Sequence, residues 1–319
     1  MKKILIILAL LATLQLLVGD VNGNWQDCFS TFVQYQTIRQ SSGMIYGVGG
    51  RYFIVSADGI NYQNILVADC DSLYLESAWM ISSSVGYCGG YVYHPSDPFL
   101  SRPVLYKTIN GGQSWIRTGQ FEQQPFWYVL QNVQFVSSSE GYVVLNPFGY
   151  AQPVKIYRTT NGGQSWTLVY SVDGHPVCSD FKVGLMAVGK YSPVGAIIST
   201  DGLNWQLRQD GLSYYPSAIL SSGSRIVASS FPNLCYSDNL GNEWHISDQS
   251  QLGSDWTTSG CHSNCAFSAQ GNNIYAITGT WDGNSVHSGI IRSLDNGSSW
   301  QWIVQPADMP DQSGQTYGI

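Results

Sequence analysis

The sequence has 319 residues, of which 44% are hydrophobic, 13% aromatic and only 11% charged, whereas about 25% of the residues of an ordinary globular domain are charged. Fourteen Lys and Arg residues stand against twenty-one Asp and Glu residues, a formal net charge of −7. The chain therefore lacks the basic surface that neutralises nucleic-acid phosphates, and its many aromatic residues are unlike a disordered segment. We expect a folded, β-rich protein that does not bind nucleic acid.

The N-terminal residues have the three parts of a secretory signal peptide. Two lysines form the positive part, residues 4–18 form an apolar stretch, and the small residues Gly19 and Gly23 follow. The apolar stretch is shorter than the roughly 20 residues needed to cross a bilayer, and no second stretch of this kind follows it in the sequence. We expect residues 1–23 to be a signal peptide and residues 24–319 to form one domain. That domain would be secreted, extracellular or in the endomembrane lumen, with no membrane span after signal removal.

Strand-like segments alternate with polar turns along the rest of the chain. A glycine followed by alternating apolar residues marks six candidate second strands, and apolar runs such as residues 129–136 and 216–220 supply first strands. The candidate second strands are residues 43–49, 86–90, 141–144, 184–189, 223–228 and 271–277.

Each second strand is followed by a hairpin whose turn carries Ser or Thr, then Asp or Asn, then Gly, and closes on an aromatic residue. The closing aromatics are Tyr62, Trp115, Trp166, Trp205, Trp244 and Trp300. They lie 39 to 56 residues apart, close to the roughly 40 to 50 residues of one four-stranded propeller blade. This spacing predicts an all-β fold, a β-propeller of four-stranded antiparallel blades. Six blades are favoured, and seven are possible if a degenerate unit lies between residues 244 and 300.

The acidic and amide residues of these turns are predicted to be structural. They are Asp58, Asn110, Asn161, Asp201, Asn239 and Asp295. Their side chains can accept hydrogen bonds from backbone N–H groups just ahead of them, while the glycines supply positive φ. Because such a residue recurs once per blade, we expect it to hold a turn and not to act in catalysis.

The pattern Ser/Thr-x-Asp/Asn-x-Gly-x-x-Trp resembles the Asp-box, or bacterial neuraminidase repeat. Residues 86–90 together with residues 108–115 look most like the photosystem II assembly and stability factor family, and the sialidase-like superfamily is a more distant resemblance. The resemblance implies a propeller whose repeated turns lie at the blade periphery, away from the ligand. Two turns, beginning at Ser56 and Ser199, are one residue shorter than the others.

Seven cysteines follow the predicted signal peptide, and in an oxidising compartment we expect some of them to form disulfide bonds. Cys28 with Cys70 and Cys261 with Cys265 are two possible pairs, although the spacing does not decide the connectivity. Cys261 and Cys265 flank a histidine, but no second ligand pair of zinc-like spacing accompanies them. We expect neither a metal nor a cofactor, since a nucleotide-binding loop is also missing from the sequence.

A sialidase site is disfavoured by the arginines and glutamates. Such a site needs three arginines to bind the substrate carboxylate, together with a tyrosine nucleophile and its glutamate partner. The mature chain has eight arginines and only four glutamates, and the Arg-Ile-Pro motif that resembles the first of the three is missing. A glycosidase with two carboxylates stays open, because a sequence does not show how far apart two carboxylates lie.

Strand order separates the two ends of the predicted propeller. In a four-stranded meander the turns between third and fourth strands lie at one end, which we call the repeat-turn face. The second-to-third turns and the connections between blades lie at the opposite end, which we call the loop face. The long segments at residues 94–103, 146–153 and 280–287 belong to the loop face, as do Tyr214 and Tyr215.

The loop face is therefore expected to hold the ligand. Its candidate binding residues are Trp127, Trp256, Trp281, Tyr150, Asp97, Arg102 and Asp282. Aromatic side chains with a few polar groups suit stacking on sugars or holding an extended polypeptide. The predicted function is a secreted, non-catalytic binding or assembly module for a protein or glycan partner. A glycoside hydrolase of the sialidase-like propeller type and a structural extracellular protein are the alternatives.

Overall fold

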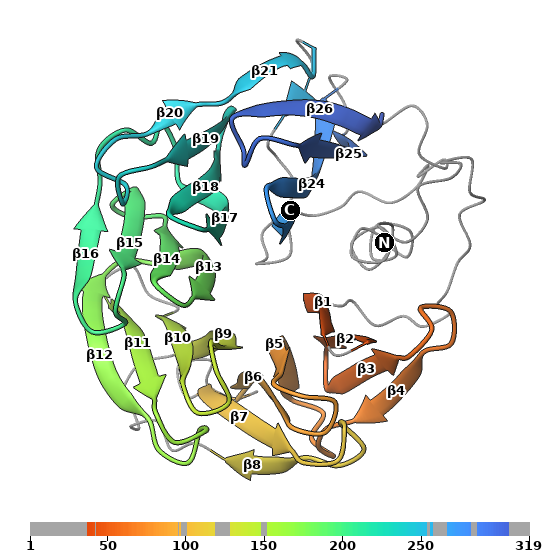
Figure 1. Cartoon of the computed structure of the whole chain (residues 1–319). Coiled ribbons are helices and arrows are strands. Elements are labelled where there is room, and N and C mark those ends of the chain that lie inside the picture. Colours follow the sequence, from red (N-terminus) through yellow and green to blue (C-terminus); the bar gives the residue numbers. More distant parts are fainter. Residues whose placement is uncertain are drawn as a thin grey trace.

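The computed structural model describes residues 37–41, 43–94, 96, 101–118, 128–147, 152–253, 256–257, 267–281 and 286–305. These residues form six β-sheets and no helix, and therefore include no helix that is long and apolar enough to cross a bilayer. The predicted signal peptide lies outside the described residues. Figure 1 shows the sheets arranged around a common centre, which is the architecture of a β-propeller.

The first three sheets each have four antiparallel strands in chain order. Sheet 1 contains β1(Thr37–Ser41), β2(Met44–Gly49), β3(Tyr52–Ser56) and β4(Gln63–Leu66). Sheet 2 contains β5(Leu73–Met80), β6(Gly86–Val92), β7(Arg102–Thr108) and β8(Ile116–Thr118). Sheet 3 contains β9(Tyr128–Phe135), β10(Gly141–Pro147), β11(Pro153–Thr159) and β12(Thr167–Asp173).

Sheets 4 and 5 repeat this arrangement, and sheet 6 modifies it. Sheet 4 contains β13(Pro176–Lys182), β14(Leu185–Lys190), β15(Gly195–Ser199) and β16(Trp205–Arg208). Sheet 5 contains β17(Pro216–Ser222), β18(Arg225–Ser230), β19(Asn233–Ser237) and β20(His245–Ile246). Sheet 6 contains β21(Asp248–Gln251), β22(Trp256–Thr257), β23(Phe267–Gln270), β24(Asn273–Trp281), β25(Val286–Ser293) and β26(Ser299–Val304).

Sheet 6 shows what the described part of the long interval before Trp300 contains. Strands β22 and β23 both pair with β24, at its two ends, while β21 adds to the outer strand β26 in parallel. After β20, which completes sheet 5, every described strand before Trp300 therefore belongs to sheet 6. A seventh unit is not formed by this part of the chain.

The predicted strand order is confirmed in each sheet. Every repeated turn joins the third strand to the fourth, as between β3 and β4 or between β25 and β26. The first strands β5, β9, β13 and β17 lie nearest the centre in Figure 1, and β8, β12 and β16 lie at the circumference. Because the strands within a blade are antiparallel, the connection that enters a first strand lies at the same end as the turn between the second and third strands, which is the loop face.

The hydrophobic core is divided among the contacts between consecutive sheets. Each of five clusters in the described residues combines side chains of two successive sheets. In sheets 2 to 6 the closing tryptophan of the turn packs into the cluster shared with the preceding sheet. Trp205 of sheet 4, for example, contacts Phe181 of its own sheet and Tyr142 of sheet 3, with ring centroids 6.2 Å away in both cases.

A belt of buried polar side chains links the inner strands of sheets 2 to 5. The Ser77 hydroxyl donates to Asn132 Oδ1 at 3.0 Å, and Asn132 Nδ2 donates to Ser179 Oγ at 2.8 Å. Close by, Gln134 Nε2 donates to Asp180 Oδ1, whose second oxygen accepts a backbone N–H of β17. These bonds cross from sheet to sheet, so the belt fixes the inner strands relative to one another.

The cysteines of the described residues are free thiols, which corrects the expected Cys28–Cys70 bond. Cys88, Cys178 and Cys235 are buried on three different sheets, and Cys70 is free as well. Burial raises the pKa of the Cys235 thiol to about 11 and that of Cys88 well above its usual value. Cys28, Cys261 and Cys265 lie outside the described residues, so a Cys261–Cys265 bond stays a prediction.

Candidate functional site

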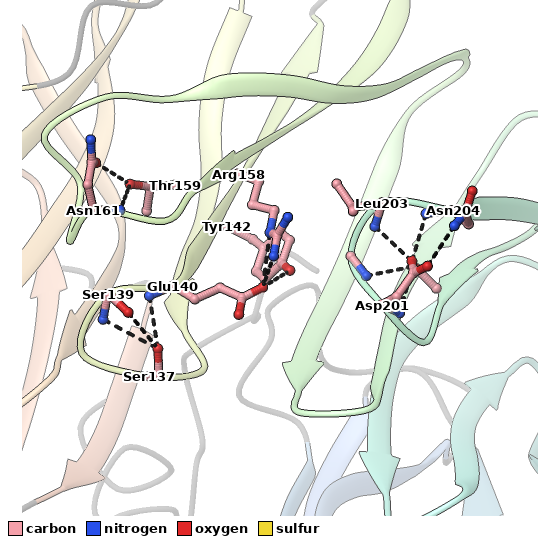
Figure 2. A network of polar contacts seen from close by, with 12 residues as sticks. Ser137, Ser139, Glu140, Tyr142, Arg158, Thr159, Asn161, Asp201, Leu203 and Asn204 are labelled. Atoms are coloured by element: carbon pink, nitrogen blue, oxygen red, sulfur yellow. Dashed lines mark hydrogen bonds and ion pairs between the residues drawn. The ribbon is translucent and has the colours of Figure 1, made fainter.

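The repeated turns are held by their own side chains. In the turn after β15, the Ser199 hydroxyl accepts the Gly202 N–H at 2.9 Å and donates to Asp201 Oδ1 at 3.1 Å. The same Asp201 oxygen accepts the N–H groups of Leu203 and Asn204 (Figure 2). These donors, chiefly the Asn204 N–H, hold the pKa of Asp201 well below its usual value. Asp201 is therefore ionised and fully engaged in the turn.

The other five turns have matching contacts. In each turn the first hydroxyl donates to the acidic or amide oxygen two residues later, at 2.7 to 3.1 Å. The accepting residues are Asp58, Asn110, Asn161, Asn239 and Asp295. The oxygens of these residues are occupied by the turn, as expected of structural residues.

An ion pair on the repeat-turn face also has a structural explanation. Arg158 Nε and the Tyr142 hydroxyl both donate to Glu140 Oε1, at 3.0 and 2.5 Å (Figure 2). Burial and the Glu140 carboxylate raise the pKa of Tyr142. Glu140 is thus an acceptor between two strands of sheet 3.

The seven predicted ligand-binding residues fall mostly where the structure gives no side chain. Trp127, Tyr150, Asp97 and Asp282 lie outside the described residues. The backbones of Trp256 and Trp281 lie in β22 and β24, where Trp256 pairs with Thr280, so the two tryptophans come from neighbouring positions. Arg102 is exposed at the start of β7, next to Val92 across the sheet. Binding by these residues stays a prediction.

Four aromatic side chains that the structure does describe form a patch on the loop face. Tyr191, in the turn after β14, lies 4.9 Å from Tyr215 between ring centroids. Tyr214 lies 4.4 Å from Tyr215 and 6.2 Å from Phe231, which is in the turn after β18. We call these four residues the aromatic patch. Three of them are strongly exposed: Tyr191 by 41%, Tyr214 by 44% and Phe231 by 49%.

The aromatic patch is anchored to sheet 5. Ser230, the last residue of β18, accepts the Tyr214 N–H at 3.0 Å and donates its hydroxyl to the Tyr214 carbonyl at 2.6 Å. The Ser213 hydroxyl donates to the Phe231 carbonyl. The connection that carries Tyr214 is thus tied to the turn that carries Phe231, which holds the two backbone segments together.

The sequence pointed to half of this patch. Tyr214 and Tyr215 were expected on the loop face from strand order, whereas Tyr191 and Phe231 were not singled out. Both of these lie in short second-to-third turns next to Ser-Pro or Pro, where the length of the turn gave no indication. Their position in second-to-third turns was the available signal.

A second pair of tyrosines lies at the loop-face end of sheet 2. Tyr74 on β5 and Tyr91 on β6 are stacked across the strands, with centroids 5.3 Å apart and planes at 14°. Glu76, two residues after Tyr74, is half-buried, and burial raises its pKa from 4.5 to about 7. Burial, with a contribution from the Glu76 charge, raises the pKa of Tyr91 to about 12. Tyr91 therefore keeps its hydroxyl proton at physiological pH.

The described residues contain no candidate metal site. No group of three or more His, Cys, Asp or Glu side chains among the described residues is placed to hold a metal ion. The described loop face instead offers half-exposed rings with hydroxyl groups and few charges. Such a surface can stack on the apolar face of a ligand and hydrogen-bond to its polar edge.

Comparisons with known proteins show the fold. No protein-family model and no curated protein sequence matches the chain. Among solved structures, an ancestral GH74 enzyme superposes with a TM-score of 0.54 at 15% identity, covering 85% of this chain and 38% of its own. U3-55K superposes with a TM-score of 0.57 at 8% identity, covering 86% of this chain and 82% of its own. The acylaminoacyl peptidase of Pyrococcus horikoshii superposes with a TM-score of 0.53 at 10% identity, covering 84% of this chain and 44% of its own.

These identities are too low to carry an activity across. The chain spans less than half the length of the GH74 enzyme and of the peptidase. The shared feature is the propeller. Function has to be argued from the side chains of the loop face.

Proposed function

We propose that this protein is a secreted β-propeller that binds glycans through aromatic side chains of its loop face. The observation that carries the proposal is the aromatic patch. Three of its four rings are tyrosines, which present an apolar face and a hydroxyl on the same side chain. A sugar has the same two kinds of surface, so stacking and hydrogen bonding can occur together.

The low charge of the chain supports a neutral glycan as the ligand. Only 11% of residues are charged and the net charge is −7, which disfavours strongly acidic polysaccharides. The rings of the patch also support one another, because they are in contact and Ser230 anchors the backbone of Tyr214. Less conformational entropy is lost when a ligand binds to rings that are already held in place.

The test is glycan-array screening of the secreted protein, followed by calorimetry with Tyr214→Ala and Tyr191→Ala. Each change should weaken binding about tenfold, since one aromatic contact contributes about 0.5–1.5 kcal/mol beyond its buried area. The control is Ile109→Ala, which removes an exposed apolar side chain from the repeat-turn face. Equal affinity of the Tyr214→Ala variant and the control, or binding of polypeptides but of no glycan, would overturn the proposal.

Glycoside hydrolysis is a second candidate, favoured by one observation. Burial raises the pKa of Glu76 to about 7, which suits a carboxylic acid that donates a proton near neutral pH. Hydrolysis also requires a second carboxylate about 5–10 Å away. Release of reducing ends from a bound oligosaccharide, lost in Glu76→Gln, would support this reading. Intact oligosaccharide after prolonged incubation would exclude it for that ligand.

A further inference from the structure

Four consecutive inner strands contain a bulge at the same place. In β5, β9, β13 and β17 one residue is skipped in the pairing with the next strand, near the loop-face end. The skipped residues are Glu76, Gln131, Val177 and Ser217. The inner strand of sheet 1 pairs without such a shift. A bulge re-aims side chains, and bulges are frequent beside functional sites.

In sheet 3 the bulge ties one sheet to the next. Gln131 Nε2 donates to the carbonyls of Pro176 and Val177 on the inner strand of sheet 4, at 3.1 and 2.9 Å. The next residue, Asn132, donates to Ser179 on the same strand. Two adjacent side chains therefore contact sheet 4, which gives the bulge a structural role there.

Sheet 2 has the same bulge with a different outcome. Ser77, which follows the bulged residue, bonds to Asn132 and accepts the Val133 N–H at 3.1 Å, as its position predicts. The bulge of β5 is occupied by Glu76, whereas the bulge of β9 is occupied by the amide residue Gln131. Within the described part of the chain, its carboxyl forms no hydrogen bond or ion pair with another residue, and burial is the sole cause of its raised pKa.

A glutamate at this position is unfavourable for the folded protein alone. A half-buried carboxyl without a partner loses solvation and gains no compensating bond. A glutamine here would avoid this loss and could donate to sheet 3 as Gln131 donates to sheet 4. Residues that fit poorly into the folded state are often those that function requires.

The side chains near Glu76 are of the kind that bind a sugar. Tyr74 lies two residues earlier on the same strand, is 45% exposed, and is stacked on Tyr91. The Glu76 carboxyl is close enough to Tyr91 for its charge to raise the pKa of that tyrosine, so a stacked ring pair and this carboxyl group lie in the same region of sheet 2. A sugar can stack on the ring while its hydroxyl groups donate to the carboxylate, and hydrogen bonds to a charged acceptor are the stronger kind.

We propose that Tyr74, Tyr91 and Glu76 form a sugar-binding subsite, separate from the aromatic patch, in which the Glu76 carboxylate accepts hydrogen bonds from sugar hydroxyl groups. This inference rests on the proposed glycan binding. It adds that the ligand is an oligosaccharide or polysaccharide chain long enough to occupy two places on the loop face. Affinity should therefore increase with the number of sugar units.

The experiment combines thermal unfolding without ligand and calorimetry with neutral oligosaccharides of increasing length from the glycan class found on the array. Glu76→Gln should raise the unfolding midpoint at pH 7.5 by roughly 2–4 °C and weaken binding of the longest oligosaccharide about tenfold or more. Tyr74→Ala should weaken the same binding. Glu243→Gln, a change of an exposed glutamate at the repeat-turn face, should alter neither property.

The failures of the two proposals differ. Wild-type protein that binds glycans with an affinity unaffected by Glu76→Gln and Tyr74→Ala would overturn the subsite and leave the proposed function intact. Loss of binding together with a lowered midpoint in Glu76→Gln would also overturn it, because the glutamate would then be structural. Wild-type protein that binds no glycan would overturn both proposals.

Discussion

Gly202 of sheet 4 lies directly against the Tyr142 side chain of sheet 3. A Cβ atom at Gly202 would overlap the Tyr142 hydroxyl, and the φ of Gly202 is +70°. The turn after β15 therefore requires glycine for two reasons: its backbone conformation and the close approach of the neighbouring sheet.

We predict that Gly202→Ala destabilises the protein by about 2–5 kcal/mol. The left-handed backbone accounts for about 1–2 kcal/mol, and overpacking against Tyr142 adds about 1–3 kcal/mol. Gly184→Ala is the matched control, because Gly184 has a φ of +81° but nothing within 4 Å of the added carbon. Urea unfolding should show the larger loss for Gly202→Ala, and equal losses would mean that the contact with Tyr142 contributes nothing.

The inner belt predicts a large effect of Asn132→Ala. Asn132 bonds to Ser77 on one side and Ser179 on the other, and its side chain is fully buried. Its removal deletes both bonds and leaves a buried polar site, at a cost of about 2–4 kcal/mol. Asn204→Ala, an exposed change in a turn, should cost less in the same urea titration. A loss below about 1 kcal/mol for Asn132→Ala would contradict a linking role for the belt.

The turn carboxylates predict acid sensitivity. The pKa values of Asp58 and Asp201 are held below 3.8 in the folded protein, chiefly by backbone N–H groups of Asn61 and Asn204. Because these folded values are lowered, the stability that the two aspartates contribute is present above pH 3.8 and lost as the pH falls below it. The double variant Asp58→Asn/Asp201→Asn should show a smaller decrease of the unfolding midpoint between pH 5 and pH 2. A parallel decrease in both proteins would contradict the prediction.

The raised pKa of Glu76 predicts that its contribution to stability changes with pH in the opposite direction. Its folded pKa is raised from 4.5 to about 7, so the stability linked to its proton is fully present below pH 4.5 and lost as the pH rises through 7. The unfolding midpoint of the wild type should therefore decrease relative to that of Glu76→Gln as the pH rises from 4.5 to 7.5. The pKa of the neighbouring Tyr91 is raised to about 12, so Tyr91 does not titrate in this range. A constant difference across this range would show that Glu76 does not titrate there.

Thiol labelling should separate the cysteines of the described sheets. Cys88, Cys178 and Cys235 are buried and burial raises the pKa of each, whereas Cys70 is half-buried. Because the thiolate is the reactive form, a thiol reagent should modify Cys70 in the native protein and the other three only after unfolding. Mass spectrometry of labelled peptides measures this. Cys70 that stays unlabelled until a reductant is added would restore the disulfide expectation for that residue.

The parts of the fold that were predictable are those that depend on local chemistry. The Ser199 to Trp205 segment specifies its turn by residues that bond to one another, so its position between two strands could be read from the sequence. Tyr191 and Phe231 could not be selected in this way. Each belongs to a short turn of a different sheet, and they are brought near the same two tyrosines by the packing of sheets 4 and 5.

Glu76 illustrates the same limit at a single position. Its neighbours in the sequence suggest an ordinary strand residue. The bulge at Glu76 depends on the register between β5 and β6, and its burial depends on how the sheets pack. Neither property is contained in the residues around it.

The division of the core among pairs of sheets has a consequence for fragments of this protein. Each of sheets 2 to 5 contributes one side to the cluster before it and the other side to the cluster after it, as sheet 4 does with Phe181 and Cys178. A cut between two sheets therefore uncovers half a cluster on each piece, and the loss does not spread beyond the adjacent contact. Stability in such a chain adds up from one neighbour to the next, as in a linear array of repeats, and the exposed half of a broken contact would be the place where two fragments reassociate.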